Sequence, residues 1–123
     1  MDTADARRFA DAWISNWNNR DLDRVLEPFA DEVVFTSPLA ARLLDGDGVI
    51  RGRDALRAYW SKGLEGYPDL HFDLVGLYVG VHTLVINYRN QAGRLGCEVL
   101  VFNGPRVVEG HGTYLDEVSF AGS

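Results

Sequence analysis

The hydrophobic pattern changes its period once along the chain, and this change limits the folds that the sequence can adopt. Before residue 70, apolar side chains recur every three or four residues, as at Phe9, Trp13 and Trp17, which is the spacing of one helix face. After residue 70, the pattern has period two, which is typical of strands. Helices followed by a run of strands predict an α+β domain rather than an alternating α/β domain.

Three helices and one short strand are predicted before residue 70. Pro28 lies inside the second helical pattern and should end it, because the proline ring removes an N–H donor and crowds the preceding turn. A stretch rich in Gly and Asp should form a loop. The predicted helices cover 3–18, 21–27 and 53–64, the strand covers 33–37, and the loop covers 38–52.

Four strands joined by hairpin turns are predicted after residue 70. Several of them are apolar on both faces, as the consecutive Leu84, Val85 and Ile86 show. Because such a sheet must cover both faces, we expect the helices on one face and a second copy of the chain on the other. The predicted strands cover 70–77, 79–89, 95–102 and 106–118.

Charge and cysteine content exclude several classes of partner and environment. The net charge is −6 and Lys62 is the only lysine, whereas binding to nucleic acid or an anionic membrane needs clustered positive charge. No apolar run approaches the roughly 18 residues of a membrane span, and no signal peptide is expected. The single Cys97 cannot form an internal disulfide. We therefore expect a cytoplasmic protein that binds neither nucleic acid nor membrane.

Three segments resemble a known family in their order and spacing. The segments 26–38 (LEPFADEVVFTSP), 50–60 (IRGRDALRAYW) and 67–72 (YPDLHF) are similar to stretches of SnoaL-like proteins and ketosteroid isomerases. The resemblance implies that 1–123 is a single SnoaL-like domain of the nuclear transport factor two superfamily. It implies a cone-shaped α+β barrel, with three N-terminal helices packed on a curved, mostly antiparallel sheet. It also implies a homodimer with one pocket per subunit for a small, largely apolar molecule.

The resemblance assigns residues to that pocket. The catalytic base of ketosteroid isomerases falls on Ser37, which has no group that titrates near neutral pH, and their tyrosine falls on Trp13. Their acid falls on Glu98, which keeps a carboxyl group. The acid of SnoaL-like cyclases has no clear counterpart, because Gly112 stands at its position. The other residues expected to line the pocket are Phe29, Trp60, Leu64, Leu100, Thr113 and Leu115.

Glu98 and His111 are the predicted catalytic pair. If Glu98 faces inward, period two also turns Leu100 inward, and the family match turns His111 inward on the last strand. A carboxylate beside an imidazole raises the histidine pKa and prepares the ring for acid or base chemistry. A buried Glu98 could instead stay protonated and donate a hydrogen bond to a ligand oxygen. A register slip of one residue would turn Glu98 to solvent.

Three functions remain open from the sequence. The first is an isomerase, cyclase or dehydratase that uses Glu98 and His111 for proton transfer on a small carbonyl-bearing molecule. The second is a non-catalytic binder, which the loss of the family base favours. The third is a dimeric protein-interaction module, which the doubly apolar strands would suit. No cofactor and no metal are expected, because the three histidines form no pair at metal-ligand spacing.

Overall fold

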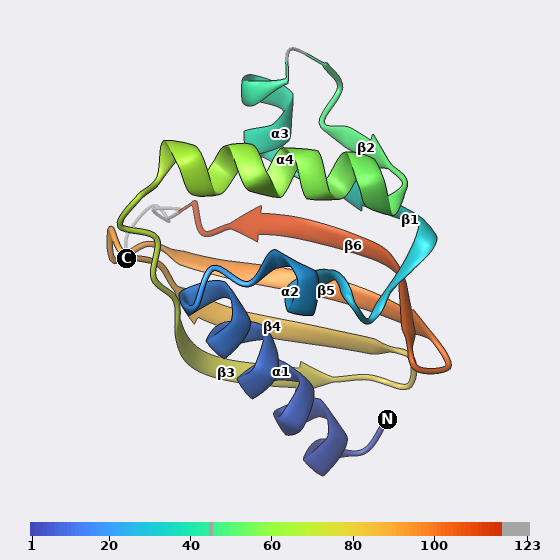
Figure 1. Cartoon of the computed structure of the whole chain (residues 1–123). Coiled ribbons are helices and arrows are strands. Elements are labelled where there is room, and N and C mark those ends of the chain that lie inside the picture. The colour runs from blue at the N-terminus through green and yellow to red at the C-terminus, as the bar shows by residue number, and fades with distance from the viewer. Residues whose placement is uncertain (45, 117–123) are drawn as a thin grey trace, which may run out of the picture.

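The computed structural model describes residues 1–44 and 46–116 of the chain. Helices precede most of the strands, as the change of period predicts, so the α+β class is confirmed. The helices α1, α2 and α4 lie against one face of a single sheet (Figure 1). The elements are α1 (Thr3–Asn18), α2 (Leu22–Leu26), β1 (Phe29–Thr36), α3 (Pro38–Leu43), β2 (Val49–Arg51), α4 (Arg53–Gly66), β3 (Asp73–Val79), β4 (Thr83–Arg89), β5 (Leu95–Asn103) and β6 (Arg106–Tyr114).

The six strands form one curved sheet in the order β2-β1-β6-β5-β4-β3. All neighbours are antiparallel except β1 and β6, which run parallel. The sheet is therefore mixed and mostly antiparallel, as expected. It does not close on itself, because β2 and β3 form its two edges.

α1 begins and packs as its sequence predicts. The Asp2 carboxylate accepts a hydrogen bond from the backbone N–H of Asp5 at 2.7 Å, which satisfies one of the free donors at the start of the helix. Its apolar face combines two alanines with two tryptophans. The buried side chains of this face are Ala6, Ala10, Trp13 and Trp17.

No helix within 1–44 and 46–116 has the length and apolar character that crossing a bilayer requires.

The predicted loop over 38–52 contains two short elements, so residues 1–44 and 46–116 form four helices rather than three. Ser37 caps α3, because its hydroxyl accepts a hydrogen bond from the backbone N–H of Leu39 at 3.2 Å, and Pro38 stands in the first turn. β2 then pairs with β1 as an edge strand. Six helical and three strand residues are too few to show a hydrophobic period.

A bulge in β6 decides which of its side chains face the helices. Opposite β5, Val101 pairs with Glu109 and Phe102 pairs with Val107, so one extra residue stands in β6 between these pairs. Counting in twos from the buried Val107 would bring His111 to the inner face. The bulge reverses this alternation, and Gly110 and Gly112 face inward instead.

Two glycines of β6 should differ in their tolerance of a side chain. A Cβ at Gly110 would lie 2.8 Å from Cδ2 of Phe35, whereas a Cβ at Gly112 would meet nothing closer than 3.5 Å. We expect Gly110→Ala to lower the free energy of unfolding by about 1–3 kcal/mol through overpacking. Gly112→Ala is the matched control and should change it by less than about 1 kcal/mol. Urea unfolding measures both, and equal losses would contradict the assigned facing of β6.

Candidate functional site

A small cavity lies between the helices and the inner face of the sheet. Its volume is about 80 Å³, and aromatic side chains form most of its wall. Helices α1 and α4 cover it, while β1, β4, β5 and β6 form its floor. The lining residues are Trp13, Trp17, Phe35, Ser37, Leu39, Tyr59, Trp60, Gly63, Tyr67, Leu70, Phe72, Tyr88, Glu98, Gly112 and Tyr114.

An outer chamber of about 250 Å³ lies beside this cavity. Six residues line both spaces, so the two have a common wall. Many of its lining residues come from the segment that follows α4 and from the turn between β4 and β5, two parts of the chain that lie on the left in Figure 1. The shared residues are Leu39, Tyr67, Leu70, Phe72, Tyr88 and Tyr114.

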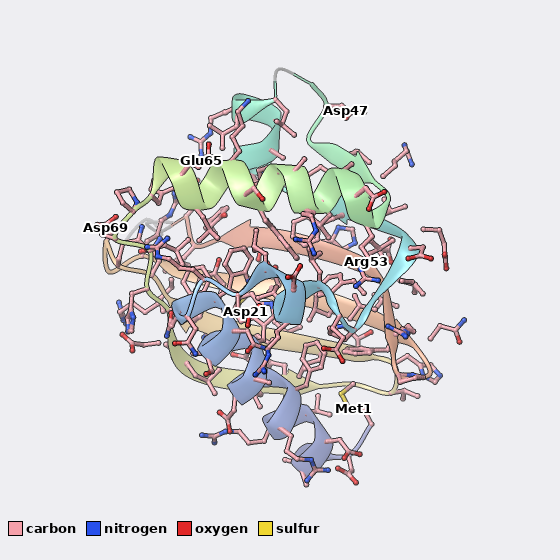
Figure 2. The ribbon with its side chains drawn as sticks, viewed as in Figure 1. Met1, Asp21, Asp47, Arg53, Glu65 and Asp69 are labelled. Atoms are coloured by element: carbon pink, nitrogen blue, oxygen red, sulfur yellow. The ribbon has the colours of Figure 1, made fainter. Side chains whose placement is uncertain are left out.

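Glu98 is the only buried carboxyl among the described residues, and it lines the inner cavity. Other acidic side chains, such as Asp47, Glu65 and Asp69, lie on the periphery (Figure 2). Glu98 is 4% exposed and forms no hydrogen bond or ion pair within 1–44 and 46–116. Burial raises the pKa of Glu98 to about 8, because a charged carboxylate loses its hydration there. At neutral pH the group therefore holds its proton and can donate it.

Glu98 and Ser37 approach the same point on the cavity floor, above Gly112. A Cβ placed on Gly112 would lie 3.5 Å from Oε1 of Glu98 and 3.6 Å from Oγ of Ser37. The Ser37 hydroxyl is also 3.1 Å from the hydroxyl of Tyr59, which lies on α4. The missing side chain of Gly112 thus leaves space in which a ligand oxygen would meet both a carboxyl and a hydroxyl group.

The three tyrosines around Glu98 are neutral donors rather than bases. Burial raises the pKa of Tyr59 to about 12, and it raises the pKa values of Tyr88 and Tyr114 as well. Their phenols therefore stay protonated across the physiological range. Glu98 is then the one lining side chain whose pKa lies near neutrality.

Two tryptophans add buried donors that have no partner. The indole Nε1 atoms of Trp13 and Trp17 are buried and make no hydrogen bond within the part of the chain that the structure describes. Both residues line the cavity. Trp13 stacks on Phe72, with ring centroids 5.5 Å apart and planes at 11°. Buried N–H groups are rarely left unbonded in proteins, so these two donors are an unusual feature of the residues around the cavity.

The sequence and the fold agree with those of known proteins. The SnoaL-like domain profile matches residues 7–116. The chain belongs to the SnoaL-like family. A SnoaL-like protein of unknown function from Burkholderia thailandensis is 36% identical to it, with a TM-score of 0.88 over 94% of this chain and 99% of that chain. The family and superfamily inferred from the three sequence segments are thereby confirmed.

More distant structures share the fold of this SnoaL-like protein. One is a proposed isomerase of the SnoaL-like family from Agrobacterium tumefaciens, with 17% identity and a TM-score of 0.74 over 93% of this chain and all of that one (100%). Another is a proposed polyketide cyclase from Sinorhizobium meliloti, with 11% identity and a TM-score of 0.72 over 92% and 100%. At these sequence identities the comparison supports a shared fold and nothing about a shared activity. No curated protein matches the sequence.

Four of the expected pocket residues of this SnoaL-like protein line the cavity, and three lie beside it. Phe29 and Leu100 are fully buried in the hydrophobic core, and Leu64 packs against that core. None of the three lines the cavity, although Phe29 packs edge-on against the lining residue Trp60. The four that line the cavity are Trp13, Ser37, Trp60 and Glu98.

The expectation that His111, Thr113 and Leu115 face the pocket is wrong. The bulge in β6 turns His111 to the outer face, where its Nδ1 lies 2.6 Å from the hydroxyl of Thr36. Thr113 is exposed, and its hydroxyl donates to the carbonyl oxygen of Cys97 at 2.7 Å. Leu115 lies beyond the end of β6 and is half exposed. Glu98 and His111 therefore do not face each other.

The sequence reasoning also missed the polar aromatic residues of the cavity. Tyr88 and Tyr114 stand at or near strand ends, and the reversed alternation in β6 is what turns Tyr114 inward. Tyr59 lies on the buried face of α4, and no sequence pattern signals that its hydroxyl approaches Ser37. Within 1–44 and 46–116, no three His, Cys, Asp or Glu side chains gather in a group that could hold a metal ion.

The burial of Glu98 should make the protein less stable as the pH rises. The pKa is about 8 in the folded state against a model-compound value of 4.5. Between these values the folded state binds more protons than the unfolded state, so the free energy of unfolding falls by up to about 1.4 kcal/mol per pH unit. Glu98→Gln removes this titration. We expect urea unfolding from about pH 5 to pH 8 to show a shallower loss in Glu98→Gln than in wild type.

Glu65→Gln provides the matched control for this measurement. The Glu65 side chain is exposed on α4 and lies on the periphery of the molecule. Its loss should leave the wild-type slope in place. Equal slopes for wild type and Glu98→Gln would show that Glu98 is not the group responsible.

Proposed function

We propose that the protein binds a small, largely apolar molecule with a carbonyl oxygen, and that protonated Glu98 donates a hydrogen bond to this oxygen. The observation that carries the proposal is a buried carboxyl group on the cavity surface with no hydrogen-bond partner among the described residues. Charged and polar groups are almost never buried without a partner. A ligand oxygen above Gly112 would supply that partner.

The proposed chemistry is proton transfer of the isomerase, cyclase or dehydratase kind. A carboxylic acid that keeps its proton at pH 7 can polarise a carbonyl and stabilise the negative charge that develops on its oxygen. The hydroxyls of Ser37 and Tyr59 lie close enough to assist, since Oγ of Ser37 approaches the same point as Oε1 of Glu98. His111 has no place in this step, because it lies on the other face of the sheet.

The cavity volume limits how the ligand fits. A hydrocarbon cavity of about 150 Å³ is enough for benzene, and the inner cavity here measures about 80 Å³. A ligand with an aromatic ring must therefore also occupy the outer chamber. We infer that its carbonyl end lies inside, beside Glu98, while the rest of the molecule extends along the shared aromatic wall.

A non-catalytic binder is the second candidate. It is favoured by Ser37, which stands where ketosteroid isomerases carry their base, and by the presence of a single carboxyl group in the cavity lining. Both candidates share the hydrogen bond from Glu98. Turnover of a bound ketone that is lost in Glu98→Gln would support the enzyme, whereas unchanged ketone in wild type would support the binder.

Ligand binding should depend on the protonation of Glu98. A thermal-shift screen of neutral aromatic and alicyclic ketones should find compounds that raise Tm, because a ligand of the folded state stabilises it by mass action. For such a ketone we expect Kd to rise about tenfold per pH unit above about pH 8 in wild type. Kd should be independent of pH in Glu98→Gln. Glu109→Gln should retain the wild-type profile, and a flat profile in wild type would refute the role of Glu98.

We also infer that the outer face of the sheet packs against a second copy of the chain. The outward side chains of β4 and β5 include Val85, Val99 and Val101, all only half-buried. A continuous apolar sheet face is seldom left to solvent. Self-association through this face would cover it.

Light scattering coupled to size exclusion tests this association. We expect wild type to elute as a dimer and Val99→Glu as a monomer, because a charge at the centre of the interface would lose its hydration. Val81→Glu is the control, since Val81 is exposed in the turn between β3 and β4 and lies away from this face. A monomeric wild type would contradict the inference.

A further inference from the structure

The charge of the pocket wall changes between the inner cavity and the outer chamber. Glu98 is the ionisable acid of the inner cavity. The outer chamber is lined by two arginines, Arg42 and Arg94, and by no described Asp or Glu side chain. The positive charge of the outer chamber stands out in a chain whose net charge is −6.

Arg94 is held at the outer chamber by the wall that both spaces share. Its guanidinium carbon lies 5.1 Å from the ring centroid of Tyr114, within the range of a cation–π contact. Its backbone is fixed in the β4–β5 turn, where the Asn90 side chain accepts from the N–H of Arg94 at 3.0 Å. Asn90 also accepts from the N–H of Ala92. The turn therefore places the arginine over the pocket.

Arg42 reaches the outer chamber from α3, a separate element. It lies in the last turn of that helix and lines the chamber. Within the described residues its guanidinium forms no ion pair or hydrogen bond, although eight other arginines take part in such contacts. As far as the described residues go, its five N–H donors are available to a ligand.

We propose that the ligand carries a carboxylate at the end remote from Glu98 and that Arg42 and Arg94 bind this carboxylate at the outer chamber. The proposal rests on the ligand site proposed above and adds the chemical class of its ligand, an apolar oxo acid. Guanidinium groups pair with carboxylates in a planar, two-pronged geometry. Two of them at the same chamber could both pair with the charged end of the ligand.

The same arrangement sets the direction in which the ligand enters. A carboxylate in the inner cavity would lose its hydration among aromatic rings and would lie beside the acid Glu98. At the outer chamber it stays partly hydrated and meets positive charge, because Arg42 and Arg94 are exposed there. The oxo group therefore enters first, and the carboxylate remains outside.

The test uses a series of ω-benzoyl alkanoic acids, such as 3-benzoylpropionate, each beside its neutral methyl ester. Kd is measured by calorimetry on the full chain at low and high salt. We expect the best acid to bind at least about fivefold more tightly than its ester at low salt, with the difference shrinking at high salt. Arg42→Gln and Arg94→Gln should each weaken the acid about fivefold and leave the ester unchanged.

Arg51→Gln is the matched control, because Arg51 is an exposed arginine of β2 that lines neither space. It should leave both affinities at their wild-type values. Acids and esters that bind equally, or an equal loss in Arg51→Gln, would overturn the carboxylate proposal while the site at Glu98 stands. If no acid binds although neutral ketones do, the proposal is likewise overturned. If neither acids, esters nor ketones bind, the proposed function fails as well.

Discussion

The parallel pairing of β1 with β6 is the contact on which the pocket depends. It joins the first part of the chain to the last strand, with Phe35 opposite Gly110 and Thr36 opposite His111. The ring of Phe35 lies so close to Gly110 that no side chain fits there, and it packs edge-on against Trp60 of α4. This pairing sets Ser37 at the cavity floor and brings α4 over it. Without it, α4 would lose its contact with the sheet through β1, whereas α1 is held by its own contacts with β3.

The cavity combines two features that oppose each other energetically. Its aromatic wall is favourable, because rings such as Trp13 and Phe72 bury large apolar surfaces and stack. The same wall removes water from Glu98, and the loss of hydration destabilises its charged form. A protein selected for stability alone would gain by placing an apolar residue there. A buried acid with a pKa near neutrality is instead typical of a site that binds or transforms a ligand.

The fold could be predicted in most of its parts, because long elements carry a periodic signal. The helix over Thr3–Asn18 and the end of the second helix before Pro28 followed from spacing and from the chemistry of proline. α3 and β2 could not be predicted, since each is too short to show a period. The candidate site was predicted in part. Ser37 and Glu98 line the cavity, but the inward position of His111 was wrong, because a single extra residue in β6 reverses the alternation and no sequence signal marks it.

The sequence by itself determined the class of fold, the family and the identity of the one acid in the pocket, because hydrophobic period and motif order are local properties of the chain. Only the tertiary structure decided what surrounds that acid. Tyr88, Tyr114 and Trp17 come from separate elements, and their approach to Glu98 depends on strand order and register. The same is true of the outer chamber, to which a helix and a distant turn contribute Arg42 and Arg94. Such neighbourhoods arise from packing between elements far apart in the chain, so periodicity cannot reveal them.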